Sequence, residues 1–167
     1  MPNSQEIEFE VGDKAVYPAQ GVAEVVGIDS KEIMDTTQTF YVLRVLDSDK
    51  KIMIPVNNVE NVGLRRIIDD REVEEVYDIM RERDVDLNTQ TWNRRYRAYV
   101  EKIQTGSAFE IAEVLRDLHL LEFEKSLSFG ERKMLDTAER LLVQELAIAK
   151  AVPEDEILEE IEHIFAG

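Results

Sequence analysis

The chain has 167 residues, 44% of them hydrophobic, and carries 20 basic against 36 acidic side chains, a formal net charge of -16. It contains no cysteine, which excludes disulfides, thiolate nucleophiles and zinc fingers. A surplus of negative charge this large repels free nucleic acid at long range, so any DNA contact has to be local. The first ten residues have no basic segment, and no apolar run approaches the ~20 residues of a membrane helix. We therefore expect a cytoplasmic protein.

The first part of the chain has the alternation and the turn residues of β-structure. Strands are expected around 14–17, 22–28, 40–46, 51–56 and 62–67, separated by Pro-, Gly- and Asp-containing turns. Five short strands are enough for a small antiparallel barrel. The predicted boundary of this module lies between residues 65 and 70, giving domains of 1–67 and 68–167.

The segment 51–56 is the most informative of these strands. Its isoleucines and Val56 share one face, which places Met53 and Pro55 on the other. Proline cannot donate to a ladder and is confined largely to edge strands. Such an edge resembles a docking surface for a strand of another protein. An ordinary barrel edge, with Met53 packed under the following loop, explains the pattern equally well.

The second part of the chain is predicted to be helical. Three N-cap residues, each followed three positions later by glutamate, predict capping boxes that mark helix starts at Asp69, Ser107 and Ser128, and Pro153 begins a last helix. Apolar residues at helical spacing follow every start. In the last helix the stripe consists of Ile157, Ile161 and Ile164. The fold class is therefore α+β, a small five-stranded β-barrel followed by an all-α domain.

Catalytic signatures are missing from the sequence. His119 and His163 lie on separate predicted helices, and the acidic pairs fall on predicted solvent faces. The seven scattered glycines form neither a phosphate-binding loop nor a dinucleotide fingerprint. We expect no enzyme activity, no cofactor, no metal site and no small-molecule substrate.

The run from Trp92 to Arg97 is the local exception to the acidic composition. Arg94, Arg95 and Arg97 lie there among two aromatic residues, a combination that suits phosphates and base steps. Trp92 also begins a stripe with Tyr96, Tyr99 and Ile103, which is the pattern of a core residue. By pattern alone, the core interpretation of Trp92 is slightly favoured over a role in DNA contact.

Ordered motifs run through both modules, over about residues 8–165. The first module contains Val11-Gly12-Asp13, Val16-Tyr17-Pro18, Gly21-Val22, Tyr41-Val42-Leu43, Pro55 and Val62-Gly63-Leu64-Arg65. The second module contains Trp92-Asn93-Arg94-Arg95-Tyr96, residues 112–118 and residues 127–135. Together these motifs resemble the CarD/CdnL family of bacterial RNA polymerase-binding transcription regulators.

The resemblance implies a fold and partners for the first module. Domain 1–67 would be a Tudor-like barrel, also found in transcription-repair coupling factors, that docks on the β subunit of RNA polymerase. The contact would use Met53 and Pro55, with Lys31 and Arg44 as secondary candidates. Some relatives carry arginine where this chain has Met53.

The resemblance also implies a DNA contact for domain 68–167. Trp92 would wedge into the minor groove of promoter DNA at the upstream edge of the melted region, while Arg94, Arg95, Arg97 and Lys133 hold the backbone. The result would be a stabilised open complex, and the protein would associate with the nucleoid through polymerase, without a membrane. The alternative is a protein–protein adaptor of polymerase that makes no direct DNA contact and keeps Trp92 in its core.

Overall fold

The computed structural model describes residues 9–85, 87 and 92–166, and the side chain of Trp92 lies outside this description. The chain forms two compact units, Met1–Ile67 and Ile68–Gly167. Each has its own hydrophobic core. Among the described residues, no helix is long and apolar enough to cross a membrane.

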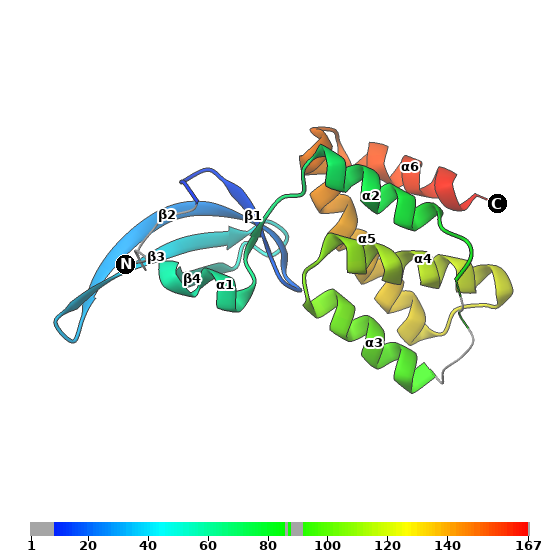
Figure 1. Cartoon of the computed structure of the whole chain (residues 1–167), viewed down its shortest axis with the longest axis horizontal. Coiled ribbons are helices and arrows are strands. Elements are labelled where there is room, and N and C mark those ends of the chain that lie inside the picture. The colour runs from blue at the N-terminus through cyan, green and yellow to red at the C-terminus, as the bar shows by residue number, and fades with distance from the viewer. Residues whose placement is uncertain (1–8, 86, 88–91, 167) are drawn as a thin grey trace. The chain divides into compact units, whose positions relative to one another are not determined.

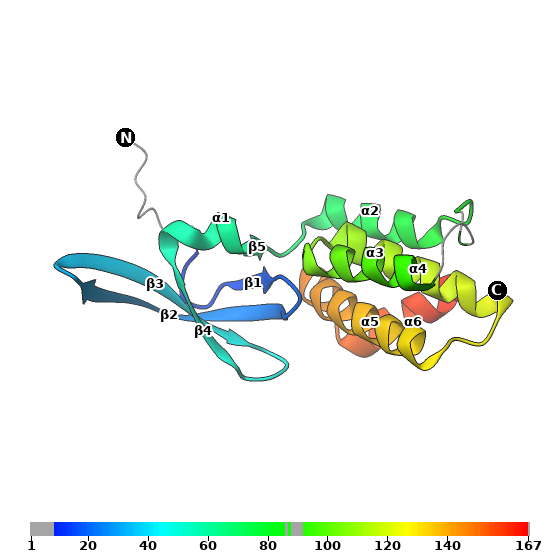
Figure 2. The ribbon, with the colours of Figure 1, turned by 90° about the horizontal axis from the view of Figure 1, so that it is seen from below.

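The first unit is built on a five-stranded antiparallel sheet (Figures 1 and 2). Its strands are β1 (Lys14–Tyr17), β2 (Gly21–Ile33), β3 (Thr36–Val45), β4 (Lys51–Pro55) and β5 (Arg65–Arg66). They lie in the order β4-β3-β2-β1-β5, so β4 is an edge strand. A 3-10 turn, η1 (Val56–Asn58), and a short helix, α1 (Val59–Val62), connect β4 to β5. The predicted fold class, a small five-stranded Tudor-like module followed by an all-α module, is confirmed.

One face of the sheet and α1 enclose the core of this unit. Val25, Tyr41, Leu43 and Ile54 are almost fully buried there. Phe9 closes the core with its ring edge-on to Tyr41 at 5.6 Å, and its backbone N–H donates to the Tyr41 hydroxyl at 3.0 Å. The tyrosine oxygen thus has a partner inside the core, as a buried hydroxyl requires.

Three strand predictions were wrong in extent. The expected strand over 62–67 is mostly absent, because α1 runs to Val62 and ends at Gly63 in the left-handed conformation, leaving two residues for β5. The strands predicted over 22–28 and 40–46 are longer, because β2 and β3 continue as an arm to a turn at Met34 and Asp35. Both turn residues have positive φ, as tight hairpin turns demand.

The second unit consists of helices. They are α2 (Asp70–Arg81), α3 (Trp92–Gln104), α4 (Ala108–Glu124), α5 (Phe129–Lys150) and α6 (Glu154–Phe165). The predicted caps at Asp69 and Ser128 are confirmed as reciprocal capping boxes. Ser107 caps its helix by accepting a bond from the Glu110 backbone, but the returning bond of the predicted capping box is not formed there. The caps satisfy backbone N–H groups that would otherwise lack partners at the helix starts.

The predicted apolar stripes of α2, α4 and α5 form the core of this unit. In α6, Ile157 and Ile161 are buried as predicted. The third buried residue of α6 is Phe165, whereas Ile164 is only half-buried, so the prediction for Ile164 was wrong by one position. The Phe165 ring stacks on the His119 imidazole at 4.3 Å, which accounts for that histidine as a packing residue.

Candidate docking edge and nucleic-acid interface

The first candidate site is the outer face of the sheet at its β4 edge. Met53 is 41% exposed, while its neighbour Ile54 is 3% exposed and points into the core. Met53 lies opposite Val42 of β3, and Pro55, which is half-buried, lies opposite Phe40. The predicted edge strand and the predicted facing of its side chains are confirmed. Proline fits there because the outer side of β4 needs no N–H for a ladder.

Strand register brings all four predicted docking residues to this same face. Arg44 follows Val42 by two residues, and Lys31 lies opposite Gln38, two residues before Phe40. Side chains two residues apart share a face of a strand. Arg44 is also held by Asp49, with Nη1 2.7 Å from Oδ1, so part of its charge is already neutralised. Lys31 is exposed on the arm.

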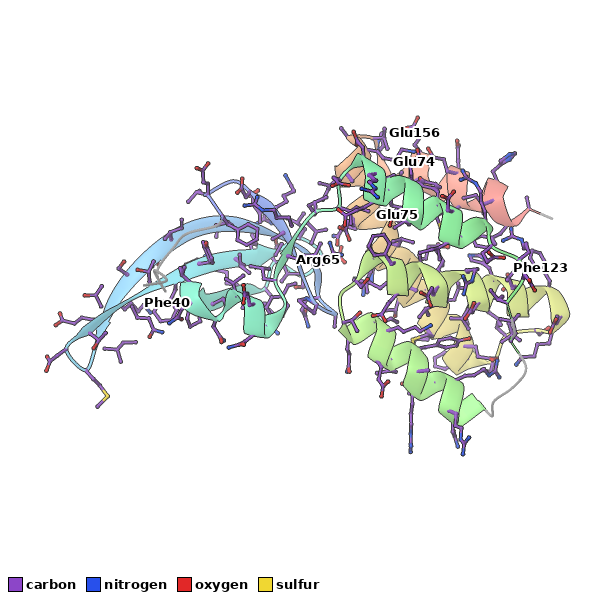
Figure 3. The ribbon with its side chains drawn as sticks, viewed as in Figure 1. Phe40, Arg65, Glu74, Glu75, Phe123 and Glu156 are labelled. Carbon is purple, nitrogen blue, oxygen red and sulfur yellow. The ribbon has the colours of Figure 1, made fainter. Side chains whose placement is uncertain are left out.

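The arm carries two apolar residues that the sequence analysis did not single out. Ile33 is 45% exposed and Met34 is 94% exposed at its tip, where no core lies beneath them. Their exposure follows from the extra length of β2 and β3. An apolar pair beside an acidic residue, within a stretch expected to form a turn, is the sequence signal that could have identified them. Phe40 lies at the base of the arm, on the face shared with Pro55 (Figure 3).

The second candidate site is the first half of α3. Arg94, Tyr96 and Arg97 are exposed, and Trp92 is the first residue of the helix. Tyr99 and Ile103, farther along, are buried at 6% and 7% exposure. The predicted core stripe is therefore correct for the second half of α3 and wrong for Tyr96, which is 45% exposed. The first half of the helix presents an aromatic ring and two arginines to solvent.

Arg95 differs from its neighbours because it faces inward. Its side chain is 17% exposed, and Nη2 lies 3.7 Å from Oε2 of Glu131, which is 1% exposed. Glu131 Oε1 accepts from Lys125 Nζ at 2.7 Å and from the Ser128 backbone at 2.9 Å. Burial alone would raise the pKa of Glu131, but these bonds outweigh it and lower that pKa, keeping the carboxylate charged. Arg95 therefore has an internal partner.

The rest of α3 is fixed to α4 by polar and apolar contacts. Lys102 Nζ lies 2.7 Å from Glu113 Oε2. Burial raises the pKa of Tyr99 to about 12, and the nearby Asp117 carboxylate adds to that rise. Burial likewise raises the pKa of Asp117, although Arg116 pairs with it at 2.9 Å. Tyr99 is neutral at physiological pH and acts as a packing residue.

The start of α5 adds a further part of the second site. Lys133 is exposed, as a backbone-contacting residue has to be. Phe129, the first residue of the helix, is 85% exposed and was missed by the sequence analysis. Its position directly after the cap residue Ser128 was the available signal, because the first turn of a helix often lies outside the core. The Arg95–Glu131 contact places this end of α5 beside the first half of α3 (Figure 1).

Comparisons with known proteins cover both units. Residues 9–68 match the family described as "CarD-like/TRCF RID domain", and residues 75–162 match "CarD, C-terminal domain". YdeB of Bacillus subtilis (strain 168), named as a candidate transcription factor, is 34% identical over 149 residues, which is 89% of this chain and 97% of YdeB. The solved structure "CdnLNt from Myxoccoccus xanthus" is 56% identical, covering 38% of this chain and 89% of its own, with a TM-score of 0.32.

Proposed function

Because the chain belongs to the CarD/CdnL family of transcription regulators, which interact with RNA polymerase and are not enzymes, we propose that it stabilises the open promoter complex. In this proposal the first unit docks on the β subunit, and the second places Trp92 in the minor groove at the upstream edge of the melted DNA. The protein then acts in the cytoplasm, at the nucleoid, wherever polymerase carries it.

The observation that carries the DNA contact is the exposed first half of α3. Arg94 and Arg97 are exposed there with Tyr96, in a chain of net charge -16. Cations among aromatic side chains suit a helix end that wedges a ring between base steps while its arginines hold phosphates. Lys133 and Phe129 would extend the contact from α5. Arg95 supports the surface from inside rather than by holding the backbone, since it is largely buried against Glu131.

The docking contact is supported by the β4 edge. An edge strand with an outward methionine and proline offers unpaired backbone groups and an apolar face to a strand of a partner. Met53 and Pro55 would form the centre of this contact, with Lys31 and Arg44 on the same face. The exposed arm residues Ile33 and Met34 would enlarge it.

Docking also explains how so acidic a protein acts on DNA. Contacts to a few phosphates give weak, salt-sensitive affinity, and the net charge opposes the approach to free DNA. A first unit bound to polymerase raises the local concentration of the second to roughly millimolar. Selectivity for promoters would then come from polymerase, without base reading by this protein.

Promoter footprinting tests the proposal. With polymerase present, the wild-type chain should protect the upstream edge of the melted region, and Trp92→Ala should lose that protection while still co-purifying with polymerase. Protection unchanged in a folded Trp92→Ala protein would exclude the wedge. Blue-shifted, quencher-protected Trp92 fluorescence in the free protein would instead favour the adaptor that never touches DNA.

A further inference from the structure

A buried carboxylate at the start of α5 is linked to three different segments of the second unit. Glu131 is 1% exposed, and its Oε1 accepts bonds from Lys125 and from the backbone of Ser128. Its own backbone N–H donates to Ser128 Oγ at 3.2 Å, completing the capping box. Oε2 accepts no hydrogen bond from the described residues and faces Arg95 of α3 at 3.7 Å. Oε1 therefore bonds to the segment that precedes and caps α5, and Oε2 faces α3.

Apolar burial does little to hold the first half of α3, among the residues that the structure describes. Between 93 and 97, only Arg95 is largely buried, and Asn93, Arg94, Tyr96 and Arg97 are exposed. The buried apolar residues of α3, Tyr99 and Ile103, lie in its second half, as does the ion pair to α4. Helix ends without buried apolar contacts open with low free energy.

We propose that Glu131 is a positioning residue. Through Arg95 it fixes the first half of α3, which begins at Trp92, relative to the first turn of α5, which carries Phe129 and Lys133. The two helix ends then act as one surface, and neither Glu131 nor Arg95 touches DNA. This inference rests on the proposed function for its consequence at the promoter, but not for its consequence within the free protein.

The charges explain why this link is an ion pair. An apolar anchor in the first turns of α3 would remove exposed positions that the DNA contact uses. A buried carboxylate needs a cation, and breaking a buried pair by removing one partner is strongly unfavourable. Lys125 pairs with one oxygen of this carboxylate, and Arg95 supplies a cation to the other oxygen from within the basic run. One of the three arginines in that run therefore has a structural role, and two remain exposed.

The test compares Glu131→Gln with Ser128→Ala in the full-length protein. Glutamine keeps an acceptor for the Ser128 backbone and removes the charge that faces Arg95 and Lys125. Ser128→Ala weakens the cap of α5 and leaves the Glu131–Arg95 pair in place. Both should lower the melting temperature. Only Glu131→Gln should speed hydrogen exchange at the amides of residues 95–98, and only it should shorten the open-complex lifetime, about fivefold.

Arg95→Gln supplies the second arm of the test. It should reproduce both effects of Glu131→Gln, and the double variant should be no worse than either single variant, because all three remove the same pair. An additional loss of lifetime in the double variant would mean that Arg95 contacts DNA directly, and would overturn the proposal. Unchanged exchange at 95–98 in both single variants would overturn it as well. If Glu131→Gln does not fold, unchanged exchange at 95–98 in Arg95→Gln alone would overturn it.

The two proposals fail in different ways. If the wild-type protein gives no lifetime gain, the proposed function fails, while the exchange data still decide the role of Glu131. If Trp92→Ala abolishes the gain and Glu131→Gln leaves both lifetime and exchange unchanged, only the positioning role fails.

Discussion

The two exposed arginines of α3 allow a quantitative prediction about salt. Arg94 and Arg97 are exposed. If each neutralises one phosphate, each adds about 0.9 to the slope of log affinity against log salt. Between 50 and 200 mM salt, the two together account for about a twelvefold loss of contact strength. Arg94→Gln with Arg97→Gln should remove this salt dependence, lowering the slope by about 1.8.

The assay measures the lifetime of the polymerase–promoter open complex with and without the protein. The ratio of the two lifetimes is followed across that salt range. The matched control is Arg71→Gln with Arg81→Gln on α2, which makes the same change in net charge at exposed positions. The control should keep the wild-type slope. If both pairs of substitutions flatten the salt dependence equally, the arginines act only through overall charge, and the phosphate contacts at α3 are refuted.

Three further predictions concern other parts of the molecule. Met53→Glu should weaken polymerase binding more than tenfold in a pull-down titration, since it places a charge in an apolar contact, while Glu60→Gln on α1 should not. Phe129→Ala should reduce the lifetime gain and change the free energy of unfolding by less than about 0.5 kcal/mol, because the ring is 85% exposed. Glu160→Gln should lower the free energy of unfolding at pH 7 by about 1 kcal/mol, because Glu160 accepts from Lys150 and Tyr77.

The pH dependence of the last effect follows from the direction of the pKa shift. Burial opposes the charged form of Glu160, but the bonds from Lys150 and Tyr77 outweigh it, so its pKa is lowered from the ordinary 4.5. Stability from this group is therefore complete above pH 4.5 and lost as pH falls through the folded-state pKa. In thermal melts, the melting temperatures of wild type and Glu160→Gln should therefore converge as the pH is lowered. A difference between the two melting temperatures that stays constant from pH 7 to pH 3 would contradict this role of Glu160.

Local signals made much of the fold predictable. Each cap, at Asp69, Ser107 and Ser128, involves only four consecutive residues, so the helix starts could be predicted without knowledge of tertiary contacts. The β4 edge was predictable for the same reason, because alternation and one proline determine it. The β2–β3 arm was not, since its outer residues cover no core and leave no apolar alternation, and its turn uses Met34 and Asp35 instead of glycine.

The candidate sites were predictable only in part. Spacing placed Trp92, Arg94, Arg95 and Arg97 together, but helical periodicity could not show that Arg95 faces a carboxylate from α5, far along the chain. That contact depends on how α3 packs in the unit, which pairs residues of high sequence separation. Phe129 was missed because an aromatic residue is usually assigned to packing, although it directly follows the cap in the first turn of a helix, where side chains often lie outside the core, and is 85% exposed.

The role of Trp92 is decided by the lifetime of open promoter complexes challenged with a competitor, measured with wild type and with Trp92→Ala at saturating protein. Wild type should prolong the lifetime, and Trp92→Ala should bind polymerase equally well but give little or no gain. A folded Trp92→Ala protein that prolongs the lifetime as much as wild type would show that Trp92 is not the wedge.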